Sequence, residues 1–290
     1  MGTEQLLGGR YRLERVAGHG GMATVFVAHD TRLDRKVAIK LLARRRDADG
    51  VLNKRFEREA RAEAKIVHPN VVSVHDYGVN EDGRPYIVMD YVEGEPLAEL
   101  IAGTPLSSER VAAIGFGIAR ALAAAHALGI FHRDVKPANI IIDGQAIPHL
   151  MDFGLARELD DHDPGVTAPG ILVGTAQYVA PEQARYGTAS PAADLYSLGA
   201  VLYHALTGEP PFSGGNALDV ALRRFEEDPA ELRELVPAAD SELTDLIHAL
   251  LARDPVDRPW EATMIAERLG DIAARLRATR TAGDSPESLR

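Results

Sequence analysis

The sequence predicts an α+β fold in which a strand-rich part of the chain precedes a helical part. Residues Tyr11 to Leu42 are typical of three strands, and Val71 to Val79 and Arg84 to Tyr91 are typical of two more. One helix is expected between these groups, from Leu52 to Lys65. From Gly94 onward the apolar residues recur mainly at helical spacing. The 290 residues are enough for one large domain or for two modest lobes that each bury a hydrophobic core.

The composition indicates a globular protein and excludes several functional classes. Hydrophobic residues make up 46% of the chain, and the formal net charge of -11 argues against non-specific binding to nucleic acid or to an anionic membrane. The chain has no cysteine, which excludes disulfides and thiolate chemistry and suits a reducing cytoplasm. No signal peptide is visible, and the longest apolar stretch, Ile114 to Phe131, is interrupted by Arg120 and His126. We therefore expect a soluble, cytoplasmic protein without a membrane span.

The stretch from His132 to Gly154 carries the clearest chemical pattern. It begins with the residues H-R-D-V-K-P-A-N, from His132 to Asn139, and ends with D-F-G, from Asp152 to Gly154. Two short apolar runs lie between these ends, and the turn signal Asp143-Gly144 separates them. The pattern predicts a hairpin that carries an acid-bearing loop on one side and a second acid on the other.

These residue types suit phosphoryl transfer. Asp134 is placed to accept the proton of a hydroxyl group, and Asn139 and Asp152 supply oxygen ligands of the kind that Mg²⁺ takes when phosphates complete its shell. Phosphoryl transfer needs in-line positioning and cations more than covalent chemistry from the protein. The spacing of the two motifs resembles that of bacterial eukaryotic-like serine/threonine protein kinases of the Pkn type.

This resemblance covers about residues 10 to 275 and implies a bilobal protein-kinase fold. A small antiparallel β-sheet with one main helix is expected to form the N-lobe, residues 10–93, as a nucleotide clamp. A larger, mostly helical C-lobe, residues 94–275, is expected to carry the catalytic loop, the activation segment and the peptide-docking loop. Residues 276–290 are expected to form a disordered tail.

Two features of the strand-rich part match the phosphate-binding residues of the family. The first is a glycine-rich turn that lets backbone N–H groups face phosphates, although Ala23 stands where the family has a third glycine. The second is Lys40, which by resemblance holds the α- and β-phosphates. Position favours Glu59 as its ion-pair partner, whereas Glu57 and Glu63 remain alternatives on sequence alone. Glu63 stands where the family usually has an apolar side chain.

The resemblance also assigns the remaining nucleotide contacts. Met89 is the expected gatekeeper residue. The Asp90 carbonyl and the Val92 amide are expected to pair with adenine, and Glu93 to reach the ribose. The other residues expected at the nucleotide are, in chain order, Val16, Gly18, Gly20, Val25, Ala38 and Lys40.

The segment after Asp152 is similar to an activation segment. Thr167 is the one hydroxyl-bearing residue in the polar stretch between residues 157 and 174, and it is therefore the expected activating phosphosite. A phosphate there would pair with Arg133, which is adjacent to the catalytic acid, and would order the segment. Phe153 is the third regulatory residue that the resemblance implies.

Residues 174–182 resemble the peptide-docking loop and the Ala-Pro-Glu motif of the family. Glu182 is expected to form an ion pair with Arg258, and Asp194 to accept backbone N–H bonds from the catalytic loop. Helices are expected after a cap at Ser107 or Ser108 with an end near Gly129, from Ser190-Pro191 to Gly208, and over Ala217–Phe225, Ser241–Leu251 and Ala262–Arg275.

The implied activity is transfer of the ATP γ-phosphoryl group to serine or threonine hydroxyls of proteins, with Mg²⁺ as the metal and Mn²⁺ as an alternative. Lys136 and Thr175 favour serine/threonine over tyrosine specificity, and Lys136 is expected to steady the γ-phosphate. ATP and protein substrates are the expected partners, with self-association for autophosphorylation in the activation segment.

Two rival functions remain open. Glu63 and Ala23 support a pseudokinase that acts as a binding scaffold, although every catalytic position is occupied by the expected residue. A small-molecule phosphotransferase is the other rival, and the docking loop argues against it. The chain is expected to be either a short soluble kinase or a piece of a longer protein.

Overall fold

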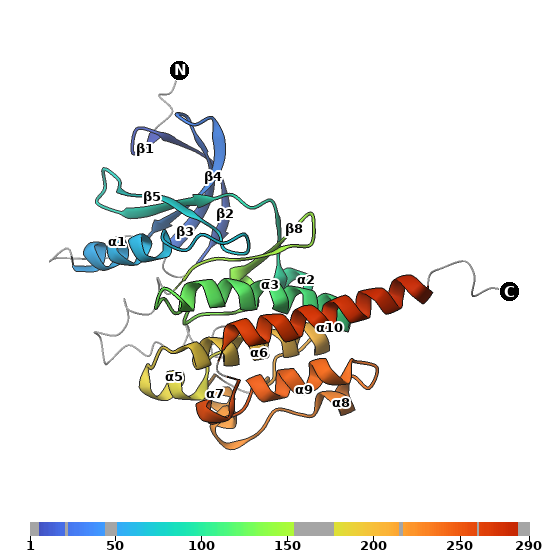
Figure 1. Cartoon of the computed structure of the whole chain (residues 1–290). Coiled ribbons are helices and arrows are strands. Elements are labelled where there is room, and N and C mark those ends of the chain that lie inside the picture. Colours follow the sequence, from blue (N-terminus) through green and yellow to red (C-terminus); the bar gives the residue numbers. More distant parts are fainter. Residues whose placement is uncertain are drawn as a thin grey trace. The chain divides into compact units, whose positions relative to one another are not determined.

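The structure is a computed structural model that describes residues 6–20, 23–43, 51–153, 177–214, 217–259 and 261–283. The chain divides into two compact units, the first made of the described residues up to Glu93 and the second of those from Gly94 onward. The first unit is built mainly of strands and the second mainly of helices (Figure 1). The predicted α+β fold class is confirmed.

The first unit contains a six-stranded antiparallel sheet with the strand order β1-β2-β3-β4-β6-β5. The strands are β1 Leu6–Leu7, β2 Tyr11–His19, β3 Ala23–Asp30, β4 Arg35–Leu42, β5 Val74–Val79 and β6 Pro85–Asp90. All except β1 were predicted from the sequence. Because β1 pairs with β2, the sheet begins before residue 10, where the N-lobe was expected to start. In β4 the buried side chains are Val37, Ile39 and Leu41, so this strand turns alternate residues toward a core.

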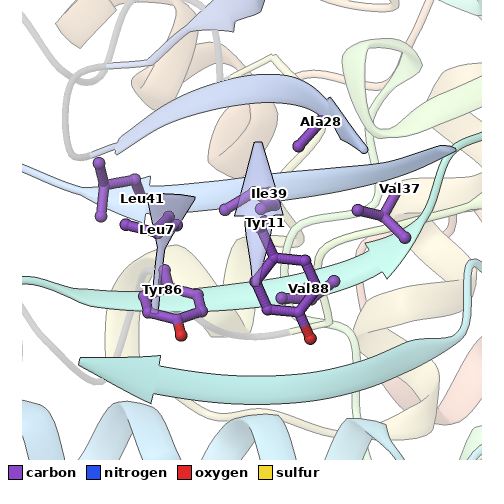
Figure 2. Close-up of a cluster of buried hydrophobic side chains, with 8 residues drawn as sticks. All are labelled: Leu7, Tyr11, Ala28, Val37, Ile39, Leu41, Tyr86 and Val88. Atoms are coloured by element: carbon purple, nitrogen blue, oxygen red, sulfur yellow. The ribbon is translucent and has the colours of Figure 1, made fainter. Parts of the chain in front are cut away.

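Figure 2 shows the hydrophobic cluster of this unit, which is made of Leu7, Tyr11, Ala28, Val37, Ile39, Leu41, Tyr86 and Val88. The rings of Tyr11 and Tyr86 meet edge to face, with their centroids 6.2 Å apart. The Tyr11 hydroxyl donates to Asp76 at 2.7 Å, which satisfies the polar end of a buried side chain. Gly78 leaves the room that the Tyr86 ring occupies, because a Cβ atom at Gly78 would collide with that ring.

A partly buried ion pair joins the turn between β1 and β2 to the end of β3. The Arg10 guanidinium donates to both carboxylate oxygens of Asp30, at 2.8 and 2.6 Å. Asp30 also accepts the backbone N–H groups of Arg32 and Leu33 in the following turn. The bonds from Arg10 are the main reason why the pKa of Asp30 is lowered to about 2.

The helix α1, Val51–Glu63, packs against β5 and β6. Its buried side chains Phe56, Ala60 and Glu63 recur at helical spacing along one stripe. The Phe56 ring contacts that of Tyr77 in β5, with centroids 5.9 Å apart. Glu63 therefore occupies a place on the buried side of this helix, where the sequence comparison with the family expects an apolar residue.

The second unit contains a three-stranded sheet, β7-β8-β9, and most of the helices. The strands are β7 Gly94–Pro96, β8 Ile140–Asp143 and β9 Pro148–Leu150. The helical segments are α2 Leu97–Leu100, α3 Ser108–His126, η1 Pro137–Asn139, α5 Pro181–Tyr186, α6 Pro191–Thr207, α7 Ala217–Glu226, α8 Leu232–Leu235, α9 Ser241–Leu250, η2 Pro255–Asp257 and α10 Ala262–Gly283. Among the described residues, no helix is long and apolar enough to cross a membrane.

The predicted starts of α3 and α6 and the predicted end of α6 are confirmed, whereas α3 ends at His126, three residues before Gly129. Ser107 caps α3 by accepting the Arg110 N–H at 3.4 Å, and Ser190 caps α6 by accepting the Ala193 N–H at 3.1 Å. The α6 helix ends at Gly208, whose φ of 82° is the left-handed conformation that glycine adopts without strain. Nearly all α6 side chains from Ala193 onward are buried, so α6 is the central helix of this unit.

The last helix is longer than the sequence analysis predicted, which corrects the expectation of a disordered tail for part of residues 276–290. The α10 helix runs alongside α3 (Figure 1) and continues past Arg275 to Gly283. Arg277 and Arg280, in the additional turns, pair with Glu109 at the start of α3, at 3.4 and 2.8 Å. The polar composition of these turns therefore reflects an exposed helix tied to its neighbour. Residues 284–290 lie outside the described residues.

Candidate active site

The hairpin β8–β9 brings the two catalytic motifs to one end. Ile140 pairs with Leu150 in the ladder, and the Asn139 carbonyl accepts the Met151 N–H at 3.0 Å. The loop from His132 to Asn139, called the catalytic loop below, therefore ends opposite the residue that precedes Asp152. The predicted juxtaposition of Asn139 and Asp152 follows from this register.

The Asp134 carboxylate is held by two side chains of the same loop. The Lys136 Nζ atom lies 2.6 Å from Asp134 Oδ2. The Asn139 Nδ2 atom donates to the Asp134 carbonyl at 2.9 Å and to its Oδ2 atom at 3.2 Å. Asp134 and Lys136 keep about a fifth of their side-chain surface exposed, at 18% and 22%. The arrangement presents an oriented and partly exposed carboxylate, which is what the predicted role of Asp134 requires.

The backbone of the catalytic loop is anchored to α6 by Asp194, as predicted. This buried carboxylate accepts the N–H groups of His132 and Arg133, each at 2.8 Å. The Nε2 atom of His126, at the end of α3, lies 2.8 Å from the same carboxylate. Arg133 has a φ of 66°, which is uncommon for a residue with a side chain, and the anchored backbone holds it there. The role of His126 was missed, because a lone histidine at a helix end carries no distinctive sequence signal.

The ring of His132 makes two hydrogen bonds, one to the residue after β9 and one within the catalytic loop. Its Nε2 atom donates to the Met151 carbonyl at 3.0 Å, and its Nδ1 atom accepts the Asp134 N–H at 3.2 Å. Burial lowers the pKa of His132, which favours the neutral form that this donor and acceptor pattern requires. The His132 ring packs on Phe153, with centroids 4.6 Å apart. Phe153 thus contacts the catalytic loop directly.

Asn139 and Asp152 are the two residues that the sequence predicts as ligands of a divalent metal ion, and both lie at the same end of the hairpin. Among the described residues, no group of three or more histidine, cysteine and acidic side chains could hold a metal ion. Mg²⁺ bound with substrate phosphates needs only one or two protein ligands, with phosphates and waters completing the shell. The bond from Asn139 Nδ2 to Asp134 fixes the amide orientation, so its oxygen is the atom left for a cation. Asp152, the other predicted ligand, has a φ of 65°, which is uncommon for a residue with a side chain.

In the first unit, the predicted phosphate-binding and nucleotide-binding residues share one face of the sheet. Gly18 is opposite Val25, and Val25 is opposite Lys40. Ala38 lies two residues before Lys40 and is opposite Met89. Because directly opposed and alternate residues of a sheet share a face, these five side-chain positions face away from the cluster in Figure 2.

The remaining residues of this predicted nucleotide set lie at the glycine-rich turn and at the end of β6. The Gly20 N–H donates to the Ala23 carbonyl at 2.8 Å and tightens the turn. Val16 precedes a register shift in β2 and is partly exposed. Val92 and Glu93 follow the last residue of β6, Asp90, whose side chain lies 2.5 Å from His75 Nε2.

The predicted partner of Lys40 falls outside what the structure describes. Glu59 lies in α1, but its side chain is not among the described ones, so the Lys40–Glu59 ion pair stays a prediction. Of the two alternatives, Glu57 pairs with Arg61 one turn along the same helix, at 2.6 Å. Glu63 is buried, with 4% of its surface exposed.

The described part of the docking loop begins at Gln177. The predicted ion pair between Glu182 and Arg258 is confirmed, with two bonds of 2.7 and 2.9 Å. Thr167 and Thr175 lie outside the described residues, so phosphorylation of Thr167 and its pairing with Arg133 stay predictions.

The strand-rich unit, the helical unit and the motif-bearing hairpin are features of the protein-kinase class of fold, and sequence comparison identifies the family. The chain belongs to the protein kinase domain family, which it matches over residues 11–268. It is 41% identical over 285 residues to serine/threonine-protein kinase PknA of Mycobacterium tuberculosis, with 97% of this chain and 65% of PknA covered. It is 42% identical over 262 residues to serine/threonine-protein kinase PknB of Mycolicibacterium smegmatis, with 89% of this chain and 42% of PknB covered.

A solved structure supports the same assignment. The crystal structure of the PknI kinase domain of Mycobacterium tuberculosis matches with a TM-score of 0.73 and 28% identity, over 94% of this chain and 99% of that domain. A probable serine/threonine-protein kinase of Streptomyces coelicolor is 42% identical over 259 residues, which cover 88% of this chain and 38% of the relative. The chain thus spans between about two fifths and two thirds of the length of these curated relatives. The predicted membership of the bacterial serine/threonine-protein kinases is confirmed.

Proposed function

We propose that this chain transfers the γ-phosphoryl group of ATP to serine and threonine hydroxyls of proteins. The observation that carries the proposal is the Asp134 carboxylate, held by Lys136 at 2.6 Å and by the Asn139 amide at 3.2 Å. A general base must be oriented and accessible, and Asp134 is both. The proposal is supported by the names of the relatives, which are serine/threonine-protein kinases.

In the proposed reaction, the substrate hydroxyl oxygen forms a bond to the γ-phosphorus while the bond from that phosphorus to the bridging oxygen of ADP breaks. Asp134 orients the hydroxyl and takes its proton. Lys136 lies close enough to Asp134 to exchange this contact for one with the γ-phosphate. Asn139 and Asp152 would hold Mg²⁺, or Mn²⁺ in its place, and the ion would neutralise charge on the phosphates.

The first unit is proposed to supply the remaining nucleotide contacts. Lys40 holds the α- and β-phosphates with Glu59 as its partner, and the glycine-rich turn covers the phosphates with backbone N–H groups. The Asp90 carbonyl and the Val92 amide pair with adenine, and Glu93 reaches the ribose. Val16, Val25 and Ala38, on the sheet, contact the base from one side.

Regulation is proposed to act through the segment between Phe153 and the docking loop. Phosphorylation of Thr167, by self-association of two copies, adds a charge that Arg133 can pair with. Arg133 is followed by Asp134 and is anchored to Asp194, so this pairing would couple the segment to the catalytic acid. We place the reaction in the cytoplasm, because that compartment supplies the ATP.

The test is incubation of the purified chain with Mg²⁺, γ-labelled ATP and protein substrate, followed by mapping of the phosphorylated residues. Asp134→Asn should lower transfer by about 10²-fold or more while Mg·ATP still raises the melting temperature. Asp152→Asn should lower both transfer and this stabilisation, because a metal ligand is lost. Wild-type turnover in Asp134→Asn would refute the assigned role. A wild type that binds Mg·ATP without any transfer would favour the pseudokinase scaffold.

A further inference from the structure

The middle of the described docking loop, which runs from Gln177 to Glu182, is buried within the second unit. Tyr178, Val179 and Ala180 are 6%, 4% and 0% exposed. A segment this buried cannot satisfy its polar groups with water, so it depends on partners from the protein. Two of these partners come from α6 and α7.

A charged side chain of α7 holds the backbone of this loop. The Arg224 Nη1 atom donates to the Val179 carbonyl at 2.7 Å, and Arg224 is only 3% exposed. Arginine is rarely buried so completely, because removing its charge from water is costly unless the charge is bonded. Its neighbour Arg223 shows the ordinary alternative, since it is exposed and donates to the Ser213 carbonyl at 3.1 Å.

A second anchor comes from α6. The Tyr178 hydroxyl lies 2.7 Å from His204 Nδ1, and the two rings are stacked with an angle of 12° between their planes. Burial lowers the pKa of His204, which favours the neutral ring, so Nδ1 can accept a hydrogen bond from the Tyr178 hydroxyl. The side chain of Tyr178 and the backbone of Val179 are thus held by different helices.

The anchored loop is linked to the catalytic acid through a few bonds. The Gln183 Nε2 atom, one residue after the Ala-Pro-Glu motif, donates to the Arg133 carbonyl at 2.7 Å. Arg133 is followed by Asp134. A shift of Val179 would therefore change where a docked peptide lies relative to Asp134, without involving any predicted nucleotide residue.

We propose that Arg224 is a positioning residue for the protein substrate. Its bond to the Val179 carbonyl, together with the Tyr178–His204 pair, holds the docking loop where a bound serine or threonine meets Asp134. This inference rests on the proposed kinase function and deepens it. Arg224 has no contact with ATP or with the transferred phosphoryl group in this scheme.

The test compares the wild type with Arg224→Met, Arg224→Lys and the control Arg223→Met. The substrates are peptides with a central threonine and randomised flanking positions, and the peptide that the wild type prefers. Arg224→Met should raise KM for this peptide by about tenfold or more, the effect of losing a charged hydrogen bond, with KM for ATP unchanged. It should also weaken the preference for residues beside the threonine. Arg224→Lys should recover part of both effects, and Arg223→Met should match the wild type.

A wild-type peptide KM and preference in folded Arg224→Met would overturn the proposal, and so would an equal rise in KM for peptide and for ATP. If Arg224→Met is too unstable to assay, Tyr178→Phe removes the other anchor with little change in volume. Tyr178→Phe should then raise the peptide KM, and a wild-type value would overturn the proposal. A wild type that phosphorylates no peptide would instead refute the kinase function itself.

Discussion

Replacing Arg258 by methionine should destabilise the second unit by about 3–5 kcal/mol. The Arg258 side chain is fully buried and donates two bonds to Glu182, which is itself 13% exposed. It also donates to the carbonyl groups of Ala252, Ala192 and Arg253, at 2.7, 2.9 and 3.0 Å. The substitution leaves a mostly buried carboxylate without its cation and removes a donor from three carbonyls, so the cost should lie at the high end for one ion pair.

Two variants show whether burial sets this magnitude. Glu182→Gln keeps the three carbonyl acceptors around the Arg258 charge, so it should cost less, about 1.5–3 kcal/mol. Arg233→Met removes another two-bond arginine–carboxylate pair, with Asp245, at 2.6 and 2.8 Å. Because those partners are 60% and 58% exposed, the cost should stay below about 1 kcal/mol.

The assay is urea and thermal unfolding followed by far-ultraviolet circular dichroism, whose helical signal comes mainly from the second unit. A domain of this size loses about 2–4 °C of melting temperature per kcal/mol, so Arg258→Met should melt about 10 °C below the wild type. Arg233→Met should melt within a few degrees of it. Equal melting temperatures for Arg258→Met and Arg233→Met would refute the argument that burial determines the strength of the pair.

Three further results are expected. Arg10 lowers the pKa of Asp30 to about 2, so the stability that this pair contributes is fully present above about pH 4 and is lost as the pH falls through about 2. The urea midpoint of Arg10→Met should therefore vary less with pH over this window than that of the wild type. Glu63→Leu should raise the basal activity of unphosphorylated protein, because the cost of desolvating the Glu63 carboxylate is expected to favour an inactive pose of α1. Unchanged activity in a folded variant would exclude this. Thr167→Ala should lower the activity of autophosphorylated enzyme several-fold, and combining it with Arg133→Ala should cause no further loss. This prediction would be contradicted if Thr167→Ala were as active as a wild type that mass spectrometry shows to be phosphorylated.

The sequence by itself determined the features that depend on neighbouring residues. The caps at Ser107 and Ser190 and the glycine after α6 act over three or four positions, so their residue types predict where helices begin and end. The hairpin with its two motifs is equally local, because Asp143-Gly144 specifies the turn and the apolar runs on either side specify the strands. The family, and with it the fold class, could be predicted because several such motifs occur in a fixed order.

The tertiary structure decided the contacts between residues that are far apart in the chain. Arg224 meets Val179 across 45 positions, Gln183 meets Arg133 across 50, and His126 meets Asp194 across 68. No periodicity or turn signal marks such a residue, because its partner is chosen by how the helices pack and its type alone fits an exposed position equally well. The last turns of α10 were not predicted for the same reason. Their arginines are typical of a polar tail, and only the packing of α10 beside α3 shows that Glu109 is an acidic partner for them.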